Sequence, residues 1–295
     1  MDDLQFLFQD PILRQTELNP GYDDHASDVW LVQTEREEVV VRSTRMRGLP
    51  DNDFWFGCSR LFGINPRHVD ELAAINRALR LFTSIPVPQV IRKGSLNGRE
   101  YLVVEKLQGS TCRSFIGLPS TALADLGTGI ASLHRFRSDW AGTISGSHQT
   151  ARSDFHDALI HTMIELVDNF YSEHQRIRQL LPSIIAMVKK LPVPSHFTFV
   201  LIDMDPTQFL TNGSELTGLV DTEVYALAPR EFDFIGLEYV LDELSAKYFK
   251  QAYAQRLALP NLESYRLPYR FFYRLLRVQG SVDVDEWLNH PVRFK

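Results

Sequence analysis

The alternation of apolar and polar residues in the first third of the chain predicts a small antiparallel β-sheet. The β-type runs are residues 28–33, 38–43, 89–93 and 99–107. The last two runs flank Asn97-Gly98, a dipeptide that suits a tight hairpin turn because both positions tolerate a positive φ. A short charged segment joins the first two runs, so we expect each pair to be antiparallel.

One helix is expected within this first region. Apolar residues recur with a period near 3.6 over residues 69–82, and Pro66 suits the first turn of a helix. Glu71 lies early on the polar side of this helix. Residues 44–64 precede the helix as an insert, and we expect its three consecutive aromatic residues, 54–56, to pack the insert onto the same region.

The remainder of the chain is predicted to be mostly helical. Helical patterns cover residues 119–135, 154–171, 174–190 and 234–257, and a last helix is expected from position 268. The exception is a hairpin around Asn212-Gly213, which we expect to form a tight turn. The predicted fold class is α+β, with a small β-rich lobe at residues 1–107 and a larger, mostly helical lobe at residues 108–295.

This hairpin has one carboxylate before it and one after it. An apolar run, residues 197–202, leads to Asp203, the return strand leads to Asp221, and Gln208 lies at the hairpin entrance. Phosphoryl transfer requires a base that orients an acceptor hydroxyl and oxygen ligands for Mg²⁺ on the nucleotide phosphates. Asp203 is a candidate for the base, and Gln208 and Asp221 are candidates for the metal ligands. Ordinary turn chemistry, in which carboxylates accept backbone N–H groups, remains open.

Composition restricts the class of protein further. The chain has 295 residues, 44% of them hydrophobic, and a net charge of -6, which is typical of a soluble globular protein and not of a nucleic-acid binder. No apolar run approaches the ~20 residues that span a membrane, and the N-terminus lacks the basic region of a secretion signal. Cys58 and Cys112 form neither a C-x-x-C motif nor a metal-binding spacing, so we expect a cytoplasmic protein.

Several motifs resemble those of the aminoglycoside phosphotransferase and choline kinase-like family, which is related to the protein kinases. Residues 201–208, LIDMDPTQ, resemble the family's H-G-D-L-x-P-x-N, and residues 220–223, VDTE, resemble its I-D-x-E. Residues 85–109 contain IPVPQV and YLVVEKLQG, which resemble I-P-V-P-x-V and Y-L-V-M-E-x-L-x-G. The sequence departs from the family where Leu-Ile replaces His-Gly and where Gln208 replaces Asn.

The resemblance implies further residues of a nucleotide site. Gly21 would lie in the turn that covers the phosphates, and Arg42 stands where the family has a Lys that contacts them. Glu71 would be the helical partner of Arg42, although the neighbouring Asp70 is an equally simple partner and a solvent-facing Arg42 also remains open. The backbone C=O of Glu105 and the N–H of Leu107 would meet the base of the nucleotide.

The resemblance and the helical pattern also bear on the second lobe. Asp233, in a segment that resembles the family's G-D-P-x-x-D, would be structural and would bond the backbone of the catalytic loop. His134 is expected to be a packed structural residue. Three arginines lie on one face of the last helix, at positions 270, 274 and 277, and we expect a solvated ridge. The alternative is that they face the acceptor and favour an anionic substrate.

The order of these motifs along the chain implies a bilobal, kinase-like fold. The implied activity is transfer of the terminal phosphate of ATP or GTP, with Mg²⁺, to a hydroxyl of a small molecule. The alternative is a nucleotide-binding module of the same fold with little or no transfer activity, because several motif positions depart from the family. We expect neither a nucleic acid nor a membrane as a partner, and a monomer and a homodimer both remain open.

Overall fold

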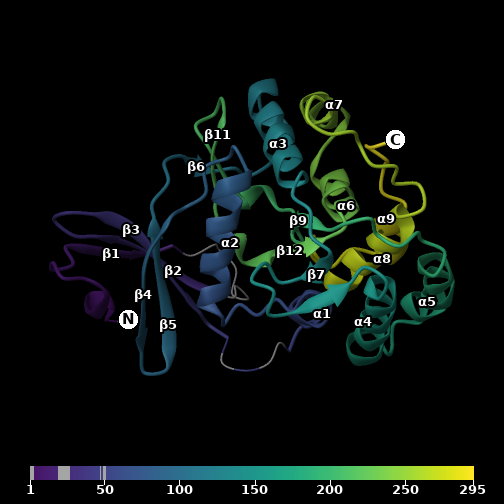
Figure 1. Cartoon of the computed structure of the whole chain (residues 1–295), viewed down its shortest axis with the longest axis horizontal. Coiled ribbons are helices and arrows are strands. Elements are labelled where there is room, and N and C mark those ends of the chain that lie inside the picture. Colours follow the sequence, from purple (N-terminus) through teal and green to yellow (C-terminus); the bar gives the residue numbers. More distant parts are fainter. Residues whose placement is uncertain (1–2, 19–26, 47, 49–50) are drawn as a thin grey trace.

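The computed structural model describes residues 3–18, 27–46, 48 and 51–295. Figure 1 shows a β-rich lobe that contains the N-terminal strands beside a larger lobe that contains most of the helices, with α2 (Val69–Phe82) at the side of the β-rich lobe that faces the helical one. The bilobal α+β arrangement predicted from the sequence is therefore confirmed.

The first lobe is an antiparallel sheet with strand order β1-β2-β3-β5-β4. Its strands are β1 (Arg14–Glu17), β2 (Ser27–Gln33), β3 (Glu38–Thr44), β4 (Val90–Leu96) and β5 (Arg99–Glu105). One face packs against the short helix η1 (Leu4–Leu7), and the other packs against α2 through Leu102, Val104 and Ala73. The period of two along each strand accounts for this division, because successive side chains point to opposite faces.

Local turn chemistry explains two details of this lobe. Asn97 and Gly98 have φ angles of 52° and 76°, so the predicted hairpin turn between β4 and β5 is confirmed. The helix α2, however, begins at Val69 and not at Pro66. The side chain of Asn65 accepts from the amide of Arg67, and this separate turn occupies the residues where we expected the helix to begin.

The insert between β3 and α2 does not pack on the first lobe, so this prediction is wrong. It contains α1 (Asp53–Phe62), which packs on α4 (Phe155–Phe170) and α8 (Arg266–Leu276) of the second lobe. Phe62 makes edge-to-face contacts with Phe232 and Phe272. The insert therefore shares the second lobe's core, although it lies within residues 1–107.

The second lobe combines helices with two small sheets. Its other helices are α3 (Ser120–Leu133), α5 (Gln175–Val188), α6 (Glu231–Val240), α7 (Glu243–Ala254) and α9 (Val284–Leu288). One sheet has the order β11-β10-β6 and the other β8-β7-β12-β9. Their strands are β6 (Ser110–Thr111), β7 (Trp140–Gly142), β8 (Gln149–Ala151), β9 (Thr198–Leu201), β10 (Phe209–Thr211), β11 (Leu216–Leu219) and β12 (Tyr225–Ala228). The helical run predicted at residues 234–257 is thus two helices, because Asp242 caps the second through the amide of Ser245.

The turn between β10 and β11 is longer than the predicted two-residue turn. Thr211 pairs with Leu216, so four residues form the connection. Gly213 has a φ of 92°, whereas the Asn212 side chain accepts from the amides of Ser214 and Glu215. Asn212 therefore acts through its side chain and does not supply a second positive φ.

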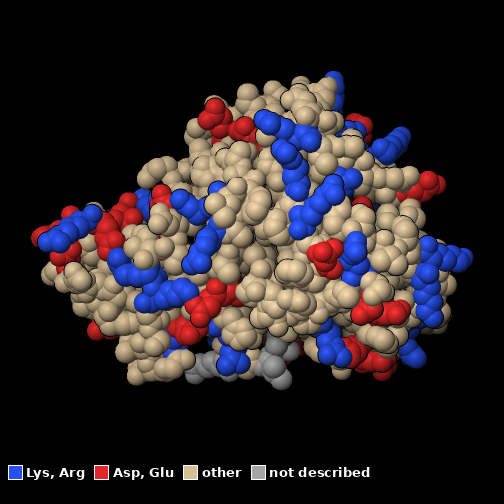
Figure 2. Space-filling model, viewed as in Figure 1, with Lys and Arg blue, Asp and Glu red and all other residues tan. Residues whose placement is uncertain are grey.

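Charged residues of both signs are interspersed over the face of the molecule that Figure 2 shows. In the described part of the chain, no helix combines the length and the low polarity that crossing a bilayer requires. Both cysteines, Cys58 and Cys112, are buried and unpaired among the described residues.

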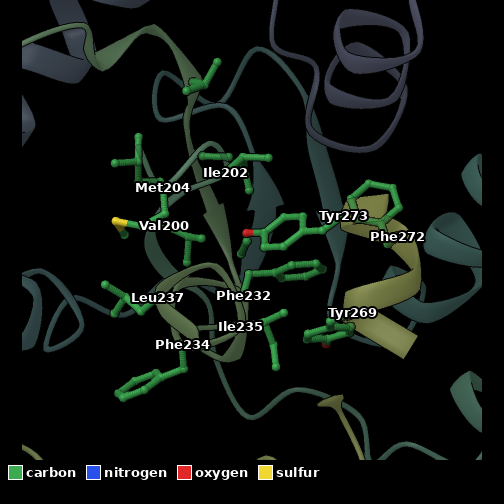
Figure 3. Close-up of a cluster of buried hydrophobic side chains, with 14 of the residues drawn as sticks. Val200, Ile202, Met204, Phe232, Phe234, Ile235, Leu237, Tyr269, Phe272 and Tyr273 are labelled. Carbon is green, nitrogen blue, oxygen red and sulfur yellow. The ribbon is translucent and has the colours of Figure 1, made fainter. Parts of the chain in front are cut away.

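An aromatic cluster fills the second lobe beneath the segment that follows β9. Phe232 of α6 stacks on Tyr269 of α8, with ring centroids 3.9 Å apart. Figure 3 shows Tyr273 extending from α8 between Phe232 and the segment that carries Ile202. This packing supports the backbone that leads to Asp203.

The predicted solvated ridge of arginines is wrong. Arg270 and Arg274 are only 2% and 4% exposed, and only Arg277 keeps a substantially exposed side chain. Arg270 donates to Glu238 of α6 at 2.6 Å, and Glu238 is fully buried. The buried carboxylate of Glu238 explains why Arg270 points inward, because a buried charge is costly unless it is paired.

Candidate active site

A buried chain of hydrogen bonds fixes the backbone that leads into the site. The amide of Leu201, at the end of β9, donates to Asp233 Oδ1 at 2.9 Å. The other oxygen of Asp233 lies 2.9 Å from His134 Nε2, and both residues are buried. The structural roles predicted for Asp233 and His134 are therefore confirmed. These two buried residues hold the end of β9 and so position the loop that follows it.

Asp203 follows this anchored strand and is only partly exposed. Its Oδ1 atom is buried and has no hydrogen-bond partner among the described residues. Burial, together with the nearby charges of Asp205 and Asp221, raises the pKa of Asp203 to about 8. A carboxylate without a donor or a cation at this position can accept a proton from a bound group.

Gln208 lies beside Asp203 and is buried. Its Nε2 donates to the backbone oxygen of Asp203 at 2.8 Å, which leaves the amide oxygen as the acceptor of this side chain. That oxygen, Oε1, is buried and has no partner among the described residues. The backbone oxygen of Gln208 accepts from the amide of Val220 at 2.8 Å, so Gln208 lies next to the end of β11 and Asp221.

Asp221 has a left-handed backbone, with φ 55° and ψ 51°. Aspartate tolerates this region better than most residues. Its side chain is 48% exposed, and its Oδ1 lies 2.5 Å from the Nη2 atom of Arg42. The residue predicted as a metal ligand and the cation predicted to hold phosphates are therefore in direct contact across the two lobes.

Arg42 points into this site from β3, and its side chain is only 11% exposed, so the solvent-facing alternative is excluded. It also lies 3.3 Å from Glu223 Oε2. Burial opposes the charged form, but the charges of Asp221 and Glu223 outweigh it and raise the pKa of Arg42 above its usual value. Burial raises the pKa of Glu223 to about 7, against the opposing charge of Arg42.

The predicted pair of Arg42 and Glu71 does not form in the structure. Glu71 accepts from the backbone amide of Ser145 at 3.0 Å and from the hydroxyl of the same residue. The alternative partner, Asp70, pairs with Lys93. Both acids of α2 have partners, and Arg42 has two carboxylates from the segment after β11.

Glu105 and Leu107 lie where the first lobe joins the second. The amide of Glu105 donates to Gln89 O at 2.9 Å, and its carboxylate accepts from Gln89 N at 3.2 Å. The Leu107 side chain lies against Gly218 of β11, since a Cβ at Gly218 would be 2.8 Å from Leu107 Cδ1. Contact of these backbones with a nucleotide base stays a prediction, and Gly21 lies outside the described residues.

The donor atoms suit Mg²⁺, which prefers oxygen ligands and often keeps one or two protein ligands besides phosphates and water. Gln208 offers an amide oxygen without a partner among the residues that the structure describes, and Asp221 offers a half-exposed carboxylate. No group of three or more His, Cys, Asp or Glu residues in the described part of the chain could hold a metal alone. The two oxygen donors of Gln208 and Asp221 leave further Mg²⁺ positions to phosphate and water, which fits a metal that arrives with phosphate ligands.

The site contains a further acid, Glu223, for which the sequence alone indicated no role. Glu223 is the acid of the D-x-E motif, and it contacts both Arg42 and the hydroxyl of Ser27. The sequence feature that could have indicated this role is its position two residues after Asp221. The short helix η3 (Thr222–Val224) brings the Glu223 side chain to the same cation, Arg42, that Asp221 contacts.

The model of the phosphotransferase enzyme family matches residues 18–268. The chain therefore belongs to the phosphotransferase enzyme family. A search of curated proteins finds no match.

Solved structures with the same fold agree with this membership. A mutant of aminoglycoside 2'-phosphotransferase-IIIa in complex with GDP is 15% identical, with a TM-score of 0.64, over 96% of this chain and 88% of that chain. The macrolide 2'-phosphotransferase MphH from Brachybacterium faecium is 13% identical, with a TM-score of 0.64, over 98% and 97%. A thermostable mutant of aminoglycoside phosphotransferase APH(4)-Ia with AMP-PNP and hygromycin B is 17% identical, with a TM-score of 0.62, over 94% and 91%.

At these identities the solved structures establish the fold, which is the kinase-like fold expected from the motifs. Family membership identifies a phosphotransferase. Family membership does not favour a binding module without transfer activity.

Proposed function

We propose that this phosphotransferase moves the terminal phosphate of ATP or GTP to a hydroxyl group of a small molecule, with Asp203 as the general base. The observation that carries the proposal is the buried Oδ1 of Asp203, which has no hydrogen-bond partner among the described residues and lies in the same site as Asp221 and Arg42. A base, a metal carboxylate and a phosphate-binding cation are the parts that phosphoryl transfer requires.

In this mechanism Asp203 accepts a hydrogen bond from the acceptor hydroxyl and takes its proton as the oxygen attacks the terminal phosphorus. The bond from that phosphorus to the bridging oxygen breaks, and a nucleoside diphosphate leaves. Gln208 and Asp221 would hold Mg²⁺ on the phosphates, and the ion would supply positive charge to the oxygens that gain negative charge.

The first lobe would bind the rest of the nucleotide. Arg42 would contact the phosphates, and the backbones of Glu105 and Leu107 would meet the base. Gly21 would lie in the turn over the phosphates. Two of the similar proteins were solved with GDP or AMP-PNP, which supports a nucleotide at the corresponding place without choosing between ATP and GTP.

The acceptor of the phosphate would be a small molecule that carries a hydroxyl group. The similar proteins include aminoglycoside and macrolide phosphotransferases, one of them solved with hygromycin B, so these compounds are the acceptor classes to test first. Arg270 is engaged with Glu238 inside the second lobe, so it gives no support to an anionic acceptor. A cytoplasmic location and a monomeric or homodimeric state remain further predictions.

Nucleotide binding is the first test. A ligand that binds the folded state raises its melting temperature, so we expect ATP or GTP with Mg²⁺ to raise the Tm of the wild type. We expect Asp221→Asn to lose most of the Mg²⁺-dependent part of this shift. A Tm that neither nucleotide changes, with or without Mg²⁺, would contradict the proposal.

A further inference from the structure

Arg42 needs a carboxylate that holds it in place if it is to contact the nucleotide phosphates. Arg42, Glu71 and Glu223 line one pocket between β3, α2 and η3, and Asp221 lies against Arg42 from the same segment as Glu223. Three acids are therefore candidates for this task. Their contacts differ, and these contacts decide among them.

Two of the three acids have another role. Glu71 is bonded to the amide and hydroxyl of Ser145, in the connection between β7 and β8. Asp221 is the half-exposed carboxylate assigned to the metal. A carboxylate that binds a metal ion cannot be reserved for Arg42 during the reaction.

Glu223 is suited to the task by its burial and by its second partner. Its side chain is only 12% exposed, and Oε2 lies 3.3 Å from Arg42 Nη2. The same oxygen accepts from the hydroxyl of Ser27, on β2, at 3.1 Å. The orientation of the carboxylate is therefore fixed by the strand that neighbours β3.

The backbone on both sides of Glu223 is also fixed. The hydroxyl of Thr222 donates to Asn76 of α2, and the oxygen of Val224 accepts from the amide of Ile202 at 3.2 Å. The segment that carries Glu223 is thus attached to the helix of the first lobe and to the strand that leads to the base.

We propose that Glu223, and not the helical Glu71, is the positioning residue that orients Arg42 toward the nucleotide phosphates; this inference rests on the proposed function. The loop after β11 then supplies both a metal ligand and the support of the phosphate-binding cation. The placement of Arg42 does not depend on an acid from α2.

The sign of the effect separates positioning from simple charge. A negative charge near a triphosphate repels it, so loss of Glu223 through charge alone would strengthen nucleotide binding. Loss of the Glu223 contact leaves the half-exposed Asp221 as the remaining carboxylate partner of Arg42, so the guanidinium is oriented less firmly and binding weakens. The two roles therefore predict opposite changes in Kd.

The experiment measures the Kd of a fluorescent ATP analogue in EDTA and, in parallel, with Mg²⁺. In EDTA we expect Glu223→Ala to raise the Kd about tenfold, as for the loss of one partner of a buried ion pair. We expect Glu223→Gln to raise it less, because the amide oxygen can still accept from Arg42 and Ser27. The surface variant Glu263→Gln is a matched control, since this glutamate is exposed.

A double-mutant cycle tests whether the effect acts through Arg42. In the Arg42→Ala background, we expect Glu223→Ala to change the Kd by less than about twofold. An equal loss in both backgrounds would indicate a merely structural role. If Glu223→Ala fails to fold, Ser27→Ala replaces it in the test. This variant removes only the hydroxyl that donates to Glu223, and it should also weaken binding.

Three results would overturn the inference. The first is an unchanged or lower Kd of Glu223→Ala in EDTA. The second is a larger increase in Kd for Glu71→Ala than for Glu223→Ala. The third is an increase in the Kd of Glu223→Ala that appears only with Mg²⁺, which would make Glu223 a metal ligand. The proposed function fails separately, if the wild type binds neither ATP nor GTP under either condition.

Discussion

Asp203 and Asp221 are both carboxylates of the candidate active site, but the protein surrounds them differently. Asp203 is partly buried, and one of its oxygens has no hydrogen-bond partner in the part of the chain that the structure describes, whereas Asp221 is half exposed and paired with Arg42. A carboxylate without a cation is the better proton acceptor, and a half-exposed one beside a cation can exchange that partner for a metal ion. The structure therefore supports different roles for the two residues.

The pKa of Asp203 leads to a prediction about pH. The base acts only when it is ionised, and burial with two neighbouring carboxylates raises its pKa to about 8 in the nucleotide-free protein. We therefore expect kcat/KM to rise about tenfold per pH unit below this pKa and to level off above it, because kcat/KM reports the free enzyme.

The measurement is an initial-rate profile from about pH 6 to pH 9.5. Nucleotide affinity is followed by thermal shift over the same range, so that titration of the phosphates can be separated from titration of the base. A rate that is flat across this range would contradict the role of Asp203 as the base.

At the residue scale, spacing along the chain carries information about which residues lie together. The distance from Asp203 to Gln208 and the hairpin up to Asp221 follow from local structure, and the structure brings these residues to one site. The partner of Arg42 could not be found in this way. Asp70, Glu71 and Glu223 are all acids near the site, and only the packing of the lobes determines which one makes contact.

Hairpins and helices were predictable to the extent that their determinants are local. Asn97-Gly98 fixes a turn by its own φ preferences. The amphipathic pattern of α1 indicates a buried face but does not indicate that α4 and α8 bury it. Strands of two to four residues, such as β6 and β12, are too short to show a pattern and form because their neighbours offer hydrogen bonds.

The elements α6 and α8 and the C-terminal segment meet at one buried carboxylate. Glu238 accepts from Arg270 at 2.6 Å and from the backbone amides of Arg293 and Phe294 at 3.1 and 3.3 Å. Arg266 Nε lies 3.3 Å from Glu238 Oε2. Removal of this carboxylate would leave a buried cation without its partner.

We therefore expect Glu238→Ala to lower the free energy of unfolding by about 3–5 kcal/mol, measured by urea denaturation. Glu243→Ala is the matched control, because Glu243 is 78% exposed and also pairs with Arg293, at 3.6 Å. Its expected loss is below about 1 kcal/mol. Equal losses for the two variants would show that this cluster is not the support of the C-terminal segment.

Across the whole molecule, the two lobes are joined through the residues of the site itself. Arg42 reaches Asp221 across the lobes, and the amide of Leu219 in β11 donates to the oxygen of Pro86 at 2.8 Å. Glu71 connects α2 to the second lobe through Ser145. The bilobal arrangement was predictable from the order of motifs, whereas these connections depend on the relative placement of the lobes.

The most direct test of the account is the release of terminal phosphate from ATP or GTP with Mg²⁺, compared between the wild type and Asp203→Asn. We expect release by the wild type, faster with an accepted hydroxyl compound, and at least about 100-fold slower release by the variant, because a general base contributes at least this factor. Nucleotide binding by the variant should be retained. Equal release by the two proteins, or binding by the wild type without release over a broad acceptor panel, would contradict the central claim.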